Sequence, residues 1–539
     1  MPDLGPALRE ELRRDRGDAG GERVDLIETH ISWVVLVGDF AWKVKKPVRL
    51  EFADFSTLDR RRRFCHEELR LNRRLAPDLY LDVVPISGSE AEPVLEGSGA
   101  PIDYAVKMRR FPQDHLLTAV VERRELAPRH VDGLADRVAR FHAEIEVAGT
   151  DSQFGHPESV WQPVVDNFEW LNRHVHDPSR RELLARVRER TQDGWPRLSK
   201  VCAHRLKGGF VRECHGDMHL GNMVLLDDRV TMFDAIDFNP GLRWVDVMSE
   251  AAFVVMDLKR RGRSDLAHRF LNRYCERTHD YAGLRLLPFY SAYRALVRAK
   301  VRAIRFDQSS VCAHADHPDD GEQRDFDRLI QLAAAAVAGR RPWLAITHGL
   351  SGSGKSTVAQ ALVEQGGAIA IRSDVERKRM HAEGALDGEP YSEESKNRTY
   401  QSLGRIAGEV LAAGLPVVVD ATFLNRNHRR GFRTIAESYD SPFTILDCTA
   451  PMNVLQSRVE QRGRRGRDAS DADLSVLETQ RTERAPLSND EREQTLLIDT
   501  SSEKHNALDG IVRRLRQSRR NLQAPSAKSL RMESAFKEP

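Results

Sequence analysis

The sequence has few cysteines, no excess charge of either sign and no long apolar run. Its six cysteines lie far apart, form no CxxC pair and have no His-rich partner pattern, which argues against a zinc site or a disulfide framework. The 83 basic and 81 acidic side chains leave a net charge of +2, so no overall field attracts nucleic acid or an anionic membrane. Any basic site must therefore be local.

Signals for export and membrane insertion are also missing. The first residues contain no apolar core of signal-peptide length, and no later stretch approaches the roughly 20 apolar residues of a membrane helix. We therefore expect a cytoplasmic, enzyme-like chain with no membrane partner. The length of 539 residues corresponds to three or four folding units of about 150 residues each.

The order of strand-like and helix-like segments divides the chain. Two β-rich runs joined by Gly38 and Asp39 predict a hairpin, and a helix is expected over 56–75. Beyond residue 343, short apolar strands alternate with helices, which predicts a parallel α/β sheet. The predicted parts are a polar segment (1–22), a small lobe (about 23–111), a helical lobe (about 112–338), an α/β domain (343–516) and a polar tail (517–539).

The segment GLSGSGKS at 349–356 fits the phosphate-loop pattern GxxxxGK[ST], between an apolar strand and an amphipathic helix. Its glycines let successive backbone amides face a phosphate. Lys355 would bridge the β- and γ-phosphates during transfer, and Ser356 would coordinate magnesium. The predicted ATP-binding residues of this loop are Gly349, Ser351, Gly352, Ser353, Gly354, Lys355, Ser356 and Thr357.

Other residues of this domain are candidates for the acceptor side. Asp374 ends the predicted strand AIAIRSD and could accept a hydroxyl proton, while Arg377 could hold acceptor or phosphoryl oxygens. Asp374 could instead only cap the next helix. Asp420 ends VVVD and is placed to orient magnesium. Arginines of RVEQRGRRGR, including Arg458 and Arg462, could form a charge-neutralising lid, although such runs are often solvated faces.

This part of the chain resembles the small P-loop kinases grouped around polynucleotide kinase, gluconate kinase and zeta toxins. The resemblance rests on four motifs that occur in the same order: GLSGSGKST, SDxxR, VVVDAT and the arginine-rich segment. The resemblance covers about residues 343–516. It implies a P-loop NTPase fold, with a parallel β-sheet flanked by helices, and ATP-dependent phosphorylation of a hydroxyl. It does not identify the acceptor, because these families differ in their acceptor pockets.

A second phosphotransfer motif, HGDMHLGN at 215–222, lies in the helical lobe and fits HGDxHxxN. Asp217 could orient or deprotonate an acceptor hydroxyl, and Asn222 could bind magnesium. Asp234 follows a predicted strand–turn–strand and could bind magnesium between the phosphates. Asp237 is a second candidate for that role.

With this motif, the chain from about 24 to 339 resembles the aminoglycoside phosphotransferase and choline kinase superfamily, whose fold is bilobal and protein-kinase-like. In that pattern a metal-binding aspartate precedes a structural aspartate by about a dozen residues. Asp234 lies twelve residues before Asp246, so Asp234 is preferred over Asp237.

The same resemblance implies a phosphate-binding lysine on a strand of the small lobe and a glutamate on the following helix. Lys43 and Glu68 match best, with Lys45 and Glu67 as the alternatives. The segment near Val106 and Met108 would lie against adenine.

The whole chain resembles a bacterial fusion of these two kinase domains. The leading hypothesis is a bifunctional kinase that uses ATP and Mg²⁺ to phosphorylate hydroxyls of small molecules. Aminoglycoside resistance does not follow, since Asp166, Glu169 and Asp177 lie in a suitable region but form no reliable acidic cluster. A polynucleotide 5′-hydroxyl kinase is an alternative that the small net charge does not favour, and a regulatory switch with one silent domain is another.

Overall fold

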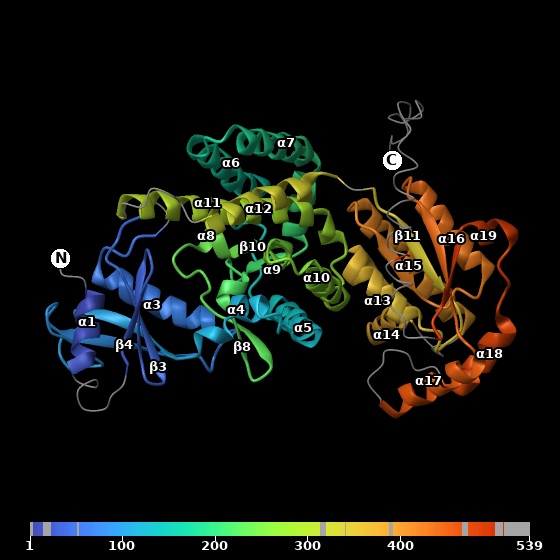
Figure 1. The fold of residues 1–539 in the computed structure, drawn as a ribbon, viewed down its shortest axis with the longest axis horizontal. Coiled ribbons are helices and arrows are strands. Elements are labelled where there is room, and N and C mark those ends of the chain that lie inside the picture. Colours follow the sequence, from blue (N-terminus) through green and yellow to red (C-terminus); the bar gives the residue numbers. More distant parts are fainter. Residues whose placement is uncertain are drawn as a thin grey trace. The chain divides into compact units, whose positions relative to one another are not determined.

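A computed structural model describes residues 4–14, 23–50, 53–312, 320–339, 341–386, 392–465, 473–501 and 510. The chain divides into two compact units (Figure 1). The amino-terminal unit comprises Met1–Thr278 and Leu286–Ala338, and the carboxyl-terminal unit comprises His279–Arg285 and Gly339–Pro539. The segment 279–285, which lies within the first predicted domain, thus groups with the second unit. The predicted tail, 517–539, lies outside the described residues.

The small lobe is built on a six-stranded antiparallel sheet in the order β1-β2-β3-β6-β4-β5. The predicted hairpin is confirmed, because β2 and β3 pair on either side of Gly38, whose φ is +50°. The strands are β1 (Asp25–Glu28), β2 (Ser32–Val37), β3 (Phe40–Lys45), β4 (Tyr80–Gly88), β5 (Pro93–Leu95) and β6 (Asp103–Arg109).

Two helices complete this lobe. Helix α3 (Leu58–Arg73) is the helix predicted over 56–75, and the Thr57 side chain caps its first turn. Helix α1 (Leu4–Leu12) lies in the predicted polar segment 1–22, yet its leucines are buried in one hydrophobic cluster with residues of the sheet. The apolar face of this short helix therefore belongs to the core of the lobe.

The helical lobe contains two short antiparallel strand pairs, β7 with β10 and β8 with β9. Helix α9 lies at its centre, since 13 of its 14 residues are buried. The elements are α4 (Leu117–Glu122), α5 (Pro128–Glu144), α6 (Pro157–His174), α7 (Pro178–Lys207), β7 (Val211–Glu213), β8 (Met223–Leu226), β9 (Arg229–Met232), α8 (Pro240–Arg243), β10 (Trp244–Asp246), α9 (Val247–Arg260), α10 (Ser264–Thr278), α11 (Leu287–Cys312) and α12 (Asp320–Val337), with single turns η2 (Gln113–His115) and η3 (Leu220–Asn222).

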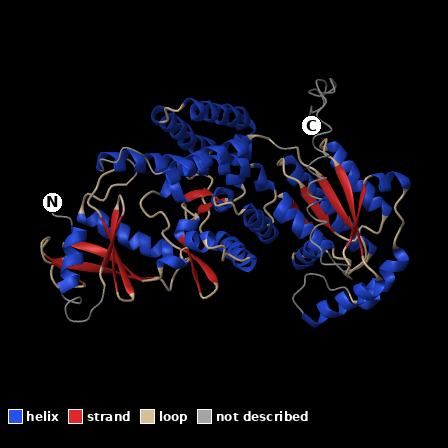
Figure 2. Cartoon of the chain, in the orientation of Figure 1, coloured by secondary structure: helices blue, strands red, loops and turns tan. Residues whose placement is uncertain are grey.

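The carboxyl-terminal unit has a five-stranded, all-parallel sheet in the order β12-β13-β11-β14-β15, which confirms the predicted α/β fold. Helices lie on both sides of the strands (Figure 2), and the central strands are runs of buried aliphatic residues, as a doubly covered sheet requires. Within the described residues, no helix combines the length and apolar character needed to cross a membrane.

The strands of this unit are β11 (Leu344–His348), β12 (Ile369–Arg372), β13 (Val417–Asp420), β14 (Phe443–Thr449) and β15 (Thr495–Asp499). Its helices are η4 (Ala282–Arg285), α13 (Lys355–Gly366), α14 (Ser373–Ala382), α15 (Glu393–Ala412), α16 (Arg426–Ser438), α17 (Met452–Arg465), α18 (Leu474–Glu483) and α19 (Asn489–Glu493). The phosphate loop joins β11 to α13, at the carboxyl ends of the parallel strands, where such folds bind ligands.

Candidate active sites

The HGDMHLGN loop joins β7 to β8 and is held by two carboxylates of α9. Glu250 accepts hydrogen bonds from the N–H groups of Gly216 (2.7 Å) and His215 (3.1 Å), and Asp257 accepts one from Leu220 (2.9 Å). The two acids are seven residues apart, so they lie on one face of the helix. Neither residue was predicted from the sequence, although two acids spaced two turns apart in an apolar helix were a usable signal.

Glu250 is fully buried, and its second neighbour is His142, whose Nε2 lies 3.0 Å away. Burial opposes ionisation of Glu250, but His142 outweighs it and lowers the pKa to about 2. With Cys214, these two residues bring three metal-ligating atoms within 4.8 Å of one another. The same three residues bond to Tyr274, to a backbone carbonyl and to the loop amides, so this cluster holds the loop in place.

Asp217 lies in the middle of this loop, with 33% of its side chain exposed. Its Oδ2 accepts a hydrogen bond from Asn222 Nδ2 at 3.0 Å and lies 3.3 Å from His219 Nε2. Burial raises the pKa of Asp217, but His219 and the nearby Arg298 outweigh this effect and hold the pKa below its usual range. Asp217 is therefore an ionised, oriented carboxylate, and the structure brings it together with Asn222.

Lys43 on β3 connects α3 to the loop that follows β9. Its Nζ lies 2.8 Å from Glu68 Oε1 and 2.5 Å from Asp234 Oδ1. Burial disfavours the charge on Lys43, but Asp234 and Glu68 more than offset it and raise the pKa. Asp234 has a φ of +64°, and its N–H donates to the hydroxyl of Tyr80.

Lys45, two residues further along β3, forms an ion pair with Asp237, the second candidate for the metal-binding aspartate. Its Nζ lies 2.7 Å from Glu68 Oε2 and 2.6 Å from Asp237 Oδ2. The side chain of Asp237 is 6% exposed, whereas that of Asp234 is 43% exposed. Asp234 therefore remains open to a ligand, while Asp237 is enclosed with its lysine.

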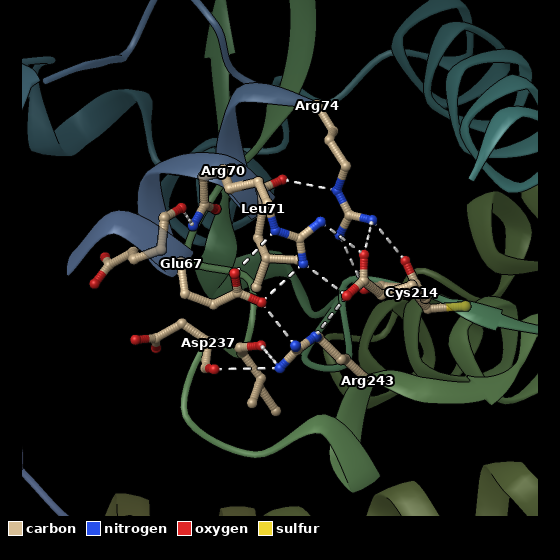
Figure 3. Close-up of polar contacts among 11 residues, drawn as sticks. Glu67, Arg70, Leu71, Arg74, Cys214, Asp237 and Arg243 are labelled. Carbon is tan, nitrogen blue, oxygen red and sulfur yellow. Dashed lines mark hydrogen bonds and ion pairs between the residues drawn. The ribbon is translucent and has the colours of Figure 1, made fainter. Parts of the chain in front are cut away.

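Glu67, the alternative partner for the lysine, belongs to a different network (Figure 3). It bonds to Arg70 and to Arg243, and these two arginines and Arg74 converge on Glu213, the last residue of β7. Burial opposes the charge on Glu213, but Arg70 and Arg74 outweigh it and lower the pKa. The network ties α3, which carries Glu68, to the strand that leads into the HGDMHLGN loop.

The two residues expected near adenine both lie on β6. Val106 is fully buried, and it and Met108 pack in one cluster with Tyr80. The strand ends at Arg109, and the next residues include Phe111, whose ring lies 5.2 Å from that of Phe233.

The phosphate loop in the second unit depends on its glycines. Gly349 and Gly352 have φ values of +138° and +81°. A Cβ at Gly349 would lie 2.4 Å from the carbonyl oxygen of Cys448, and one at Gly352 would lie 2.7 Å from that of Leu455. The loop conformation and the close approach of the backbone thus exclude side chains at both positions. Lys355 Nζ donates to the carbonyl oxygen of Leu350 at 2.8 Å.

A cavity of about 190 Å³ adjoins this loop. Six predicted loop residues line it, and Gln480 on α18, which the sequence analysis missed, accepts a hydrogen bond from the Ser351 N–H at 2.8 Å. Ser353 is buried and does not line the cavity. The lining residues are Ser351, Gly352, Gly354, Lys355, Ser356, Thr357, Arg372, Ser373, Asp374, Asp420, Ala421, Thr422, Arg462, Val476 and Gln480.

The candidate acceptor residues differ in their placement. Asp374 lies in the first turn of α14 rather than at the end of a strand, because β12 ends at Arg372. Asp374 is not the capping residue, and it lines the cavity. Arg377 contacts Asp374 Oδ1 at 3.2 Å but does not itself line the cavity.

Asp420 ends β13, as predicted, and is buried beside Ser356. Burial raises the pKa of Asp420, although the hydrogen bond with Ser356 and the charge of Lys355 oppose that rise. The two side chains form a pair of oxygen donors next to the phosphate loop.

The two lid candidates on α17 behave differently. Arg458 donates to the carbonyl oxygens of Thr500 (2.7 Å) and Gly352 (3.3 Å), so backbone contacts hold it. Arg462 lines the cavity, and its charge is one of those acting on Lys355, whose pKa burial lowers. Of these two arginines, Arg462 is the one that lines the cavity.

Comparison with known proteins places both halves in kinase-related families. Residues 39–287 match the family model of the phosphotransferase enzyme family, and residues 344–487 match that of an AAA domain. The uncharacterized proteins Rv2004c of Mycobacterium tuberculosis (strain ATCC 25618 / H37Rv) and Mb2027c of Mycobacterium bovis (strain ATCC BAA-935 / AF2122/97) are each 32% identical over 460 residues. Each match covers 83% of this chain and 88% of the relative. These matches confirm both family resemblances.

Solved structures similar to parts of the chain include two kinases. A gluconokinase from Sinorhizobium meliloti 1021 is 24% identical and covers 34% of this chain and 97% of its own, with a TM-score of 0.27. A choline/ethanolamine kinase family protein from Mesorhizobium loti is 12% identical and covers 62% of this chain and 99% of its own, with a TM-score of 0.37.

Proposed function

We propose that this chain, a phosphotransferase that belongs to the same protein family as its two mycobacterial relatives, carries two separate kinase sites. Each site transfers the γ-phosphate of ATP to a hydroxyl group of a small molecule. The observation that carries the proposal is that each unit gathers, among its own residues, a phosphate-binding lysine and carboxylates suited to the acceptor and to a cation. Neither set borrows a residue from the other.

In the amino-terminal unit, Asp217 orients the acceptor hydroxyl and receives its proton. Glu68 holds Lys43 at 2.8 Å, so that its ammonium group can bind phosphate oxygens. Asn222 and Asp234 supply amide and carboxylate oxygens, the donors that Mg²⁺ prefers. Bound magnesium would supply charge neutralisation for the phosphates.

In the carboxyl-terminal unit, the glycine-dependent loop offers its amides to the phosphates, and Lys355 adds a positive charge. Ser356 and Asp420 would hold magnesium through their oxygens. Asp374 receives the acceptor proton, Arg377 positions Asp374 from 3.2 Å, and Arg462 neutralises charge that develops during transfer.

The test is transfer of label from γ-labelled ATP into a pool of sugars, sugar acids, nucleosides, aminoglycosides and 5′-hydroxyl oligonucleotides. Lys355→Ala should abolish labelling at the second site only, and Asp217→Asn should abolish labelling at the first site only. Asp193→Asn, at an exposed position of α7, is the matched control and should change neither.

Loss of all labelling in either variant would contradict two separate sites. A labelled oligonucleotide that disappears in Lys355→Ala would replace the small-molecule acceptor of the second site with a nucleic acid end. Tight ATP binding without any labelled acceptor would favour a nucleotide-dependent switch over a kinase.

A further inference from the structure

A cavity of about 470 Å³ in the amino-terminal unit is lined in part by Arg294, which bonds to Gly216 of the HGDMHLGN loop. Residues of α6, α8, β10, α9 and α11 line it, as do residues 153–155. Aromatic side chains form much of the wall, with the Phe154 and Trp244 rings stacked at 5.7 Å and Tyr290 and Tyr293 also lining the cavity. This volume lies within the usual range of small-molecule sites.

One of the two charged residues of this wall is Arg294 on α11, which is only 6% exposed. Its Nε donates to Ser249 Oγ at 3.2 Å, and its Nη1 donates to the carbonyl oxygen of Gly216 at 3.1 Å. Its guanidinium carbon lies 4.9 Å from the ring centre of Phe253. Across the described residues, no carboxylate forms an ion pair with Arg294.

The other charged residue of the wall is already neutralised. Both carboxylate oxygens of Asp246 receive hydrogen bonds from Arg205, at 2.6 and 2.8 Å, and the Met248 N–H donates to the same carboxylate. The cavity wall therefore carries one uncompensated positive charge. Arginine keeps its charge at any physiological pH, and a buried cation without an anion is costly.

These observations indicate that the cavity favours a ligand with a negative charge. We propose that the cavity binds the acceptor of the first kinase site, and that this acceptor is a hydroxyl compound with an anionic group held by Arg294. Its apolar or aromatic part packs against Trp244 and Phe154. The proposal rests on the proposed function of Asp217, because Arg294 holds the peptide group immediately before that residue.

The same geometry argues against a polycationic acceptor. Asp166, Glu169 and Asp177 are the acids that the sequence places in this region, and all three are exposed and absent from the cavity wall. Asp177 instead caps α7, and Asp166 binds Gln162. An aminoglycoside would meet the charge of Arg294, and the one carboxylate of the cavity wall, Asp246, is already paired with Arg205.

The preference of the cavity for an anionic ligand can be tested with three probes that share one scaffold and differ in charge: 4-(hydroxymethyl)benzoate, 4-(hydroxymethyl)benzamide and 4-(hydroxymethyl)benzylamine. Calorimetric titration of the full chain should show that the carboxylate binds about tenfold to a hundredfold more tightly than the amide, as expected for a charged hydrogen bond, and that the amine binds most weakly. Arg294→Met should abolish this preference, Arg294→Lys should retain it, and Arg186→Met, at an exposed position of α7, should leave it unchanged.

Asp217→Asn separates this inference from the proposed function. The variant should bind the benzoate with the wild-type preference and fail to phosphorylate it. Continued phosphorylation by Asp217→Asn would refute the role of Asp217 while leaving the anion site intact. Equal or absent binding of the three probes, or a preference that survives in Arg294→Met, would overturn the anion site itself.

Discussion

Replacing Glu250 with glutamine should loosen the catalytic loop of the first site. Glu250 is fully buried and accepts from two backbone amides, at 2.7 and 3.1 Å, with His142 at 3.0 Å. A glutamine has one acceptor oxygen, and its NH₂ group must face at least one of these donors in either orientation. Losing a charged hydrogen bond and leaving a buried donor unpaired should cost about 2 to 4 kcal/mol of loop stability.

Amide hydrogen exchange measures this loss of loop stability at the two backbone amides that Glu250 binds. A cost of that size should speed exchange at residues 215 and 216 by roughly thirtyfold to several hundredfold, if these amides exchange through local opening. Glu144→Gln makes the same change at an exposed position at the end of α5 and should leave exchange unchanged. Exchange within about twofold of the wild type in Glu250→Gln would refute the anchoring role of α9.

Two further predictions concern the second unit. Gly352→Ala should weaken ATP binding there by more than about tenfold, because the position has a φ of +81° and a Cβ would lie 2.7 Å from the Leu455 carbonyl oxygen. The control for this calorimetric measurement is Gly431→Ala, where nothing lies within 4 Å of an added Cβ. Equal ATP affinity of the two variants would contradict this prediction. Burial raises the pKa of Asp420, so folding favours the protonated form of this carboxyl group. Its contribution to folding stability is therefore complete below the unfolded-state pKa near 4, and it is lost as the pH rises through the folded-state pKa. Denaturant unfolding of Asp420→Asn should lack this part of the pH dependence, and a profile identical to that of the wild type would show that Asp420 is not responsible.

Local motifs carried most of what the sequence could predict. The phosphate loop is contiguous and its pattern is local, so its residues could be predicted from the sequence, although the carbonyl oxygens of Cys448 and Leu455 that also exclude side chains at Gly349 and Gly352 could not. The choice between Lys43 and Lys45 was harder, because both are on one face of β3 and both bond to Glu68. The twelve-residue spacing to Asp246 favoured Asp234 over Asp237, and the packing of the loop after β9 leaves Asp234 open and encloses Asp237.

Residues whose roles depend on distant partners were missed or misplaced. Glu250 and Gln480 accept hydrogen bonds from backbone amides far away in the sequence. The spacing of Glu250 from Asp257 in an apolar helix was a signal for the first of these contacts, whereas no local pattern marks Gln480. Asp374 was assigned to the end of a strand, but the helix begins one residue before it. Arg458 and Arg462 lie on one helix, and tertiary contacts distinguish them: Arg458 donates to the carbonyl oxygens of Gly352 and Thr500, whereas Arg462 lines the cavity.

The number of nucleotides bound per chain tests the central claim, that each unit carries its own ATP site. Titration with a non-hydrolysable ATP analogue and Mg²⁺ should give two sites for the wild type and one for each of Lys43→Met and Lys355→Ala. The double variant should bind none. A single site in the wild type, or loss of both sites in either single variant, would contradict the account.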